Sequence, residues 1–268
     1  MDSDIHTDNY SRSAGILPKN RGKKIVDILT YHNADIIALQ EVDKELYGIV
    51  NQYFVESKYG VFYANRNGNR PDGLVIAYRQ SKFEELSRDT YSYDTLAKQS
   101  SIKDEAYLTN HIAQCIRLKL IPSLDSPTLS PVFTVYNTHL FWNPARDDVK
   151  YFQFASMINV IINNAKSEGS AEGFPSRLII LGDFNSLPNS NALQLISTNP
   201  KPIEGRIETK YGKEKILENC LKIYEGMDMG EVKRLGLKNA YEGYGKIALR
   251  KGGVEENGSG SSDRKSVV

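Results

Sequence analysis

The sequence lacks the marks of secreted and membrane-spanning proteins. Its 268 residues include 2 cysteines, Cys115 and Cys220. Two cysteines give no disulfide framework and favour a reducing compartment. No apolar run approaches the roughly 18 residues of a membrane span, and the N-terminus has neither the basic flank nor the apolar core of a signal peptide. We therefore expect an intracellular protein, cytoplasmic or nuclear, without membrane contact.

The charge balance also lacks a strong excess of either sign. The formal net charge is +1, so no general attraction to nucleic acid is predicted, and any such binding must come from a local site. The length and the hydrophobic content of 40% allow one large α/β domain. We place this domain at residues 21–250, with a flexible N-terminal segment over 1–20 and a disordered Gly/Ser-rich tail over 251–268.

The chain does contain short aliphatic runs that end on reactive side chains. Residues 178–181 are four consecutive aliphatic residues, which indicates a strand buried on both faces. This strand ends at Gly182 and Asp183, and Asn185 follows two residues later. Gly182 allows a sharp bend, and the carboxylate and the carboxamide would share one side of an extended chain. The pair suits hydrolytic chemistry, although an Asx-type turn accounts for the same residues.

Two further strands are predicted to end in the same way. Residues 135–140 read as a strand that ends on His139, and residues 34–42 form an apolar strand that ends close to Glu41. A lone histidine or glutamate at such a position is often a packing or a solvated residue. Three buried strands that each deliver an acid or a base at the C-terminal end nevertheless predict a shared active-site rim.

Other segments predict the elements around this rim. Residues 59–64 and 74–78 indicate a β-hairpin, whose connecting loop carries Arg66 and Arg70. These arginines could contact phosphates, but a solvated loop is the simpler interpretation.

A helix is expected to begin soon after the strand that carries His139. Asn143 is a good N-cap, and Pro144 is a good first helical residue. Trp142, the only tryptophan, lies at the same rim. Its indole could stack on a ligand or pack against the protein, and packing is the simpler interpretation.

Taken in chain order, these motifs resemble one superfamily. Gln40 and Glu41, then residues 137–140, then residues 182–186 resemble the endonuclease/exonuclease/phosphatase superfamily, which includes DNase I, neutral sphingomyelinase and the inositol polyphosphate 5-phosphatases. Residues 137–150 look like the branch of the deadenylases and nocturnin. The resemblance implies a DNase I-like α/β fold, a four-layer α/β/β/α sandwich of two mixed sheets.

The resemblance also implies a role for each residue of the rim. Glu41 would bind Mg²⁺, with Mn²⁺ as the alternative, and Asp183 would align and deprotonate a water molecule. Asn185 and His139 would donate hydrogen bonds to the phosphate, and Pro144 would lie against a nucleobase. The implied function is a magnesium-dependent 3′–5′ RNA exonuclease that acts on a single-stranded 3′ end, with poly(A) as one candidate. The sequence indicates no protein partner.

The sequence departs from the family pattern at both ends. Members begin with a strand that ends in an asparagine and finish with strands that carry an aspartate and a Ser-Asp-His motif, and these motifs are absent here. We therefore expect a fold that is incomplete at both termini and an activity that is weak or absent, since a general acid–base group contributes about 10²–10⁴ in rate. The alternatives are a catalytically dead relative that binds RNA or protein, and a phosphatase or sphingomyelinase-type phosphoesterase of the same superfamily.

Overall fold

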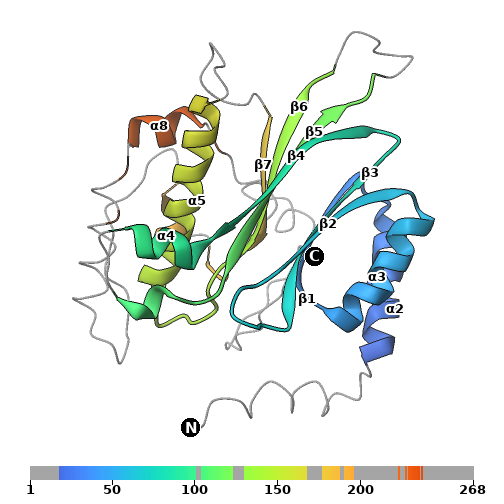
Figure 1. Ribbon diagram of the computed structural model, residues 1–268, viewed down its shortest axis with the longest axis horizontal. Helices are drawn as coiled ribbons and strands as arrows, with labels where there is room; N and C mark the ends of the chain where they lie inside the picture. The colour runs from blue at the N-terminus through green and yellow to red at the C-terminus, as the bar shows by residue number, and fades with distance from the viewer. Residues whose placement is uncertain are drawn as a thin grey trace, which may run out of the picture.

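Two β-sheets form the inner layers of the structure, and helices cover their outer faces, as the computed structural model shows (Figure 1). The structure describes residues 18–100, 104–122, 130–167, 177–187, 190–195, 223, 227, 229–235 and 237. The four layers confirm the predicted DNase I-like α/β architecture. The predicted tail over 251–268 and most of the segment over 1–20 lie outside the described residues.

The first sheet is antiparallel in its described strands and has the order β1-β3-β2. Its elements, with the helices of its outer face, are α2 (Pro18–His32), β1 (Ile36–Asp43), α3 (Lys44–Glu56), β2 (Tyr59–Asn65) and β3 (Asp72–Arg79). The two helices pack on the sheet through a cluster that includes Val50, Phe54 and Val75. β2 and β3 pair as the predicted hairpin. The side chain of Asp43 caps α3 by accepting a hydrogen bond from the backbone N of Leu46 (2.8 Å).

The second sheet has the order β4-β5-β6-β7, and its last pair of strands is parallel. Its elements and their covering helices are β4 (Phe83–Ser92), α4 (Tyr93–Gln99), the 3₁₀ helix η1 (Glu105–Tyr107), β5 (Ile112–Leu120), β6 (Val132–His139), α5 (Asp147–Ser167), β7 (Leu178–Asp183), α6 (Asn191–Gln194) and α8 (Met229–Arg234). Parallel neighbours need a crossover connection, and α5 provides it across the outer face. None of the described helices could cross a membrane.

Two local expectations were wrong. The helix after β6 begins at Asp147 rather than at Pro144, because Asn143 forms a turn instead of an N-cap. Its side chain accepts from the backbone N of Ala145 (2.9 Å), and its carbonyl accepts from the backbone N of Arg146 (3.1 Å). β7 is half-buried rather than buried on both faces, since it is the last strand of the described sheet.

A buried polar network joins the two sheets within an otherwise apolar interface. The side chain of Asn137 on β6 accepts a hydrogen bond from Gln40 Nε2 (2.8 Å) and donates to the carbonyls of Leu39 (3.2 Å) and Val75 (3.1 Å) in the first sheet. It also contacts Gln114 Oε1 (3.2 Å), and Gln114 Nε2 donates to the carbonyl of Phe62 (2.9 Å). Asn137 and Gln114 are fully buried. Each amide is satisfied by a partner across the interface, so the network fixes how the sheets align.

The Asn137→Ala variant should therefore lose about 2–4 kcal/mol of unfolding free energy, since it leaves the half-buried amide of Gln40 and the buried amide of Gln114 with fewer partners. Denaturant unfolding measures this loss. The matched control is Thr90→Ala at an exposed position of β4, which should change the unfolding free energy by less than about 0.5 kcal/mol. Equal stability of the two variants would show that the network does not hold the sheets together.

Candidate functional site

The parallel pairing of β6 and β7 brings two predicted site residues together. The register places His139 opposite Asp183, and His139 Nε2 lies 4.0 Å from Asp183 Oδ2. The side chain of His139 is 8% exposed, whereas that of Asp183 is 48% exposed. The imidazole is thus held by the protein while the carboxylate is open to solvent. His139 Nδ1 is buried and has no hydrogen-bond partner among the residues that the structure describes.

The chain turns sharply after Asp183. Gly182 has φ 144°, and a Cβ atom at this position would collide with the carbonyl oxygen of Thr138, so the close approach of the strands requires glycine. Asp183 Oδ1 accepts a hydrogen bond from the backbone N of Asn185 (2.8 Å), and Asn185 Nδ2 donates to the carbonyl of Leu140 (2.8 Å). The Asx-type turn considered in the sequence analysis is therefore present, and Asp183 Oδ2 still faces His139.

The first turn of α5 supports this loop. Lys150 Nζ donates a hydrogen bond to the carbonyl of Asn185 (3.1 Å) and lies 3.8 Å from Asp147 Oδ1. Asp147 Oδ2 in turn accepts from Asn191 Nδ2 (3.0 Å). Burial lowers the pKa of Lys150 and raises the pKa of Asp147. Because this buried pair holds the carbonyl of Asn185, the loop has little freedom to move away from His139.

Glu41 lies where β1 becomes irregular. The pairing of β1 with β3 shifts register between Leu39 and Val42, and Glu41 has φ 56°, an uncommon value for a residue with a side chain. The preceding residue, Gln40, bonds to Asn137, which is two residues before His139 on β6. β1 also contacts β7. The end of β1 is therefore held beside the ends of β6 and β7, with the Glu41 side chain exposed.

The donor set at this rim fits a cation that keeps most of its water. Among the described residues, no group of three or more His, Cys, Asp or Glu side chains could hold a metal ion, so an all-protein cage of the zinc type is absent from the part of the chain that the structure describes. Mg²⁺ needs only one or two carboxylates together with water and substrate oxygens. The exposed carboxylate of Glu41 meets that requirement.

No sequence motif marks His111, which the fold places beside His139. The two rings lie edge to face with centroids 5.9 Å apart. His111 Nδ1 lies 2.9 Å from Thr109 Oγ1 and 3.4 Å from an Arg66 terminal nitrogen. Because a guanidinium can only donate, Nδ1 accepts and the proton of the neutral ring lies on Nε2. Burial and the Arg66 guanidinium lower the pKa of His111 to about 3.

Pro144 and Trp142 lie on the loop that follows His139. Pro144 is exposed, and the Trp142 side chain is 62% exposed with its ring centroid 6.0 Å from that of Phe141. The indole therefore does not pack into the core, and the expectation of packing was wrong. The contact of Pro144 with a nucleobase stays a prediction.

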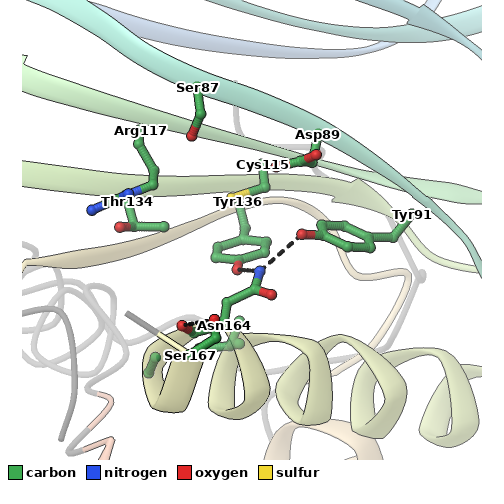
Figure 2. A pocket seen from close by; sticks show the side chains of 11 residues that line it. Ser87, Asp89, Tyr91, Cys115, Arg117, Thr134, Tyr136, Asn164 and Ser167 are labelled. Carbon is green, nitrogen blue, oxygen red and sulfur yellow. Dashed lines mark hydrogen bonds between the residues drawn. The ribbon is translucent and has the colours of Figure 1, made fainter. Parts of the chain in front are cut away.

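A separate cavity of about 160 Å³ lies on the other face of the second sheet. Figure 2 shows Asn164 of α5 reaching Tyr91 and Tyr136 beneath the sheet, and its Nδ2 donates to both phenol oxygens (2.8 and 3.1 Å). Strand residues alternate between faces, so Tyr136 faces α5 while His139 shares the inter-sheet face of Asn137. This cavity therefore is not part of the rim.

Comparison with known proteins bears on the function of this rim. The profile described as the Endonuclease/Exonuclease/phosphatase family matches residues 14–212. The chain is 32% identical to Protein angel homolog 2 from Bos taurus over 186 residues, which cover 69% of this chain and 32% of that protein. It is 27% identical to the CCR4-Not complex 3′-5′-exoribonuclease subunit Ccr4 from Yarrowia lipolytica, over 86% of this chain and 35% of that protein. The chain thus spans about a third of the length of these relatives.

Solved structures of two proteins match the fold of this chain. ANGEL2, solved as a 2′,3′-cyclic phosphatase in complex with adenosine-2′,3′-vanadate, matches with a TM-score of 0.54 and 25% identity, over 82% of this chain and 53% of that one. The human Nocturnin catalytic domain matches with a TM-score of 0.51 and 17% identity, over 67% of this chain and 63% of that one. The Nocturnin likeness supports the fold alone, because the identity is low.

The shifted pKa of His111 predicts a pH-dependent stability. The pKa is about 3 in the folded chain and about 6.5 in an unfolded chain, so the stabilisation is complete above about pH 6.5 and is lost as the pH falls toward 3. When the pH falls from 7 to 5, the unfolding free energy of both proteins should decrease. The decrease should be smaller for the His111→Gln variant than for the parent, by at most about 2 kcal/mol.

Denaturant unfolding at the two pH values measures this difference. The control is His32→Gln, which changes an exposed histidine at the end of α2 and should retain the pH dependence of the parent. If the His111→Gln variant and the parent lose the same free energy, folding does not lower the pKa of His111.

Proposed function

Because the chain belongs to the Endonuclease/Exonuclease/phosphatase family, we propose that it hydrolyses phosphodiester bonds at the single-stranded 3′ end of RNA. The observation that carries this proposal is the His139–Asp183 pair at the ends of two parallel strands. The likeness to a 3′-5′-exoribonuclease subunit favours RNA as the substrate and the 3′ end as the place of attack. The weak turnover expected from the sequence stays a prediction.

Asp183 is suited to orient and deprotonate the attacking water. Its Oδ1 accepts a hydrogen bond from the backbone N of Asn185, which fixes the carboxylate, and its Oδ2 remains directed toward His139. The side chain is 48% exposed, so water can reach it. A carboxylate that is held in place by one oxygen and reactive through the other is a suitable general base.

His139 and Asn185 are suited to stabilise the charge that develops on the phosphate. The imidazole of His139 is fixed by burial and by the neighbouring ring of His111. Asn185 Nδ2 uses one proton for the carbonyl of Leu140, which leaves its second amide proton for a phosphate oxygen. Donors that are already in place need no reorganisation during the reaction, and one such donor contributes about 10²–10³ in rate.

Glu41 would hold a divalent cation, Mg²⁺ or Mn²⁺, through its exposed carboxylate. When bound, the cation supplies neutralisation of the negative charge on the phosphoryl oxygens. The protein's own contribution is the position of Glu41. Gln40 ties the irregular end of β1 to Asn137, which supports a position of the carboxylate close to the ends of β6 and β7.

A second candidate function is hydrolysis of a 2′,3′-cyclic phosphate at the end of an RNA. The likeness to ANGEL2, which is described as a 2′,3′-cyclic phosphatase, favours it. The same rim residues would serve, since both reactions place water in line with a phosphoester bond. A panel of oligo(A), mixed-sequence RNA, RNA with a 2′,3′-cyclic phosphate end and a phosphoinositide separates the two functions from a phospholipid-type phosphatase.

The Asp183→Asn variant should lower the rate of RNA hydrolysis by about 10²–10⁴, because the general base is lost. Its amide oxygen can still accept from the backbone N of Asn185, so the turn should persist. Stepwise shortening of 5′-labelled oligo(A) measures the rate. The control is Asp89→Asn on the exposed part of β4, which should retain the parent rate.

Equal rates for Asp183→Asn and the parent would exclude Asp183 as the base. A parent without hydrolysis on any substrate of the panel would favour the binding-only alternative.

The Glu41→Gln variant should lose both hydrolysis and cation binding, because a neutral carboxamide is a weak ligand for Mg²⁺. Calorimetric titration with Mg²⁺, and the rise in Tm that a bound cation causes, measure binding without turnover. The control is Glu84→Gln, an exposed glutamate on β4. Unchanged Mg²⁺ affinity in Glu41→Gln, or hydrolysis that continues in a chelator, would remove Glu41 from the cation site.

A further inference from the structure

A cleft of about 640 Å³ adjoins the rim described above. One wall is the start of α3 at residues 43–45, and the other is the loop that joins β2 to β3, with Asn65, Arg66 and residues 68–71. Clefts of roughly 300–1,000 Å³ are typical of ligand sites. No role has been given so far to this cleft.

Both walls of the cleft begin at the rim. Asp43 lies two residues beyond Glu41 on β1. On the other side, Arg66 contacts His111, whose ring lies edge to face with that of His139. The positive charge of Arg70, further along the loop, helps to lower the pKa of His111, so Arg70 is also close to the rim. An RNA strand with one phosphate at His139 could continue directly into this cleft.

The loop wall is rigid before any ligand binds. Asn67 Nδ2 donates to Ser92 Oγ (2.6 Å), and the backbone N of Asn67 donates to the carbonyl of Asn110 (3.2 Å). Gly68 has φ 65°, and a Cβ atom there would collide with the side chain of Asn110. The loop is thus packed closely on the start of β5, and the earlier expectation of a solvated loop does not fit Arg66, which is 14% exposed. A preformed wall lowers the entropic cost of binding.

The charges of the cleft are only partly neutralised within the protein. Arg66 pairs with Asp72 (3.2 Å), and the Asp43 carboxylate accepts from the backbone N of Leu46 in the first turn of α3. Glu45 lies in the same turn, where the exposed amides of the helix offset part of its charge. Lys44 and Arg70 are exposed, and neither has an ion pair among the described residues. Two cations on facing walls therefore remain available for an anionic ligand.

We propose that this cleft binds the nucleotides of a single-stranded RNA that flank the reacting one, with Lys44 and Arg70 on their phosphates. This inference rests on the proposed function, and it extends the site from the reacting phosphate to the neighbouring nucleotides. Lys44 and Arg70 bind by charge, so the contact does not depend on sequence. Asn65 and Asn69 on the loop wall offer donors and acceptors for ribose hydroxyls or base edges.

Fluorescence anisotropy with 5′-labelled RNA in a chelator tests this contact without turnover. The probes are a ten-nucleotide strand and a dinucleotide. The double variant carries Lys44→Ala together with Arg70→Ala, and a single variant carries Arg70→Lys. The control is Lys58→Ala, which lies outside the cleft. The double variant should bind the long strand about tenfold more weakly than the parent does. The slope of log affinity against log salt should become shallower by about 1.4, as expected for two lost phosphate contacts on a single strand. The dinucleotide should show a much smaller change, and Arg70→Lys should retain most of the parent affinity.

The outcomes separate this inference from the proposed function. If the double variant binds the long strand as tightly as the parent and Lys58→Ala do, the cleft does not hold the strand, whether or not the chain hydrolyses RNA. An equal loss for the dinucleotide and the long strand would place the cations at the reacting nucleotide and overturn the flanking contact. A parent that binds no RNA also overturns it. Weaker binding of the long strand, together with no hydrolysis by the parent, supports the cleft and refutes the proposed activity. Thermal unfolding of each variant shows that the fold is retained.

Discussion

The buried amide of Asn137 is the constraint on which the arrangement of the rim depends. From β6 it reaches Gln40 and the carbonyls of Leu39 and Val75 in the other sheet. Apolar side chains between the sheets favour close contact but tolerate small lateral shifts. A hydrogen bond between buried groups does not tolerate such shifts, since a misplaced amide would remain unsatisfied. The network therefore sets the lateral alignment of the sheets, and with it the place of Glu41 relative to His139.

Positive φ values occur at the strand ends that form the rim, as they do in loops at Asn69 and Asn110. Glu41, Gly182 and Asn185 all have positive φ values, of 56°, 144° and 46°. Asn33 and Lys58 also have positive values, but they follow helices, where a left-handed residue is ordinary. Gly182 and Asn185 are residue types that adopt positive φ readily, whereas Glu41 is not; hydrogen bonds made by Gln40 and Lys150, and the bond that the carbonyl of Leu140 accepts from Asn185, hold these segments in place. Glu41 is thus the strained residue of the rim, and strain that the surrounding structure maintains is characteristic of functional positions.

Much of the fold could be predicted from the sequence, because buried strands carry apolar runs or alternation. The strands predicted at 59–64 and 74–78 lie within β2 and β3, which pair as the predicted hairpin. β4 has no periodic pattern of apolar residues, since five consecutive residues in it are exposed. Its position in the sheet is fixed by pairing with β5. The N-cap predicted at Asn143 was wrong, because an asparagine side chain can stabilise a turn as well as cap a helix. His139 and Asp183 could be predicted because each ends an apolar strand. The contact between His111 and Arg66 could not be predicted, since the two residues lie 45 positions apart and the contact depends on tertiary packing.

The long separation of the bonded residues also determines when the rim can form. Gln40 and Asn137 are 97 positions apart, and Leu140 and Asn185 are 45 positions apart across the α5 crossover. The β2–β3 hairpin joins neighbouring segments and can form early, whereas distant closures carry a larger entropic penalty and come late. An intermediate that has only its local hairpins consequently has no rim. Assembly of the reactive groups marks the end of folding, so a nascent or half-folded chain carries none of the chemistry of the finished one.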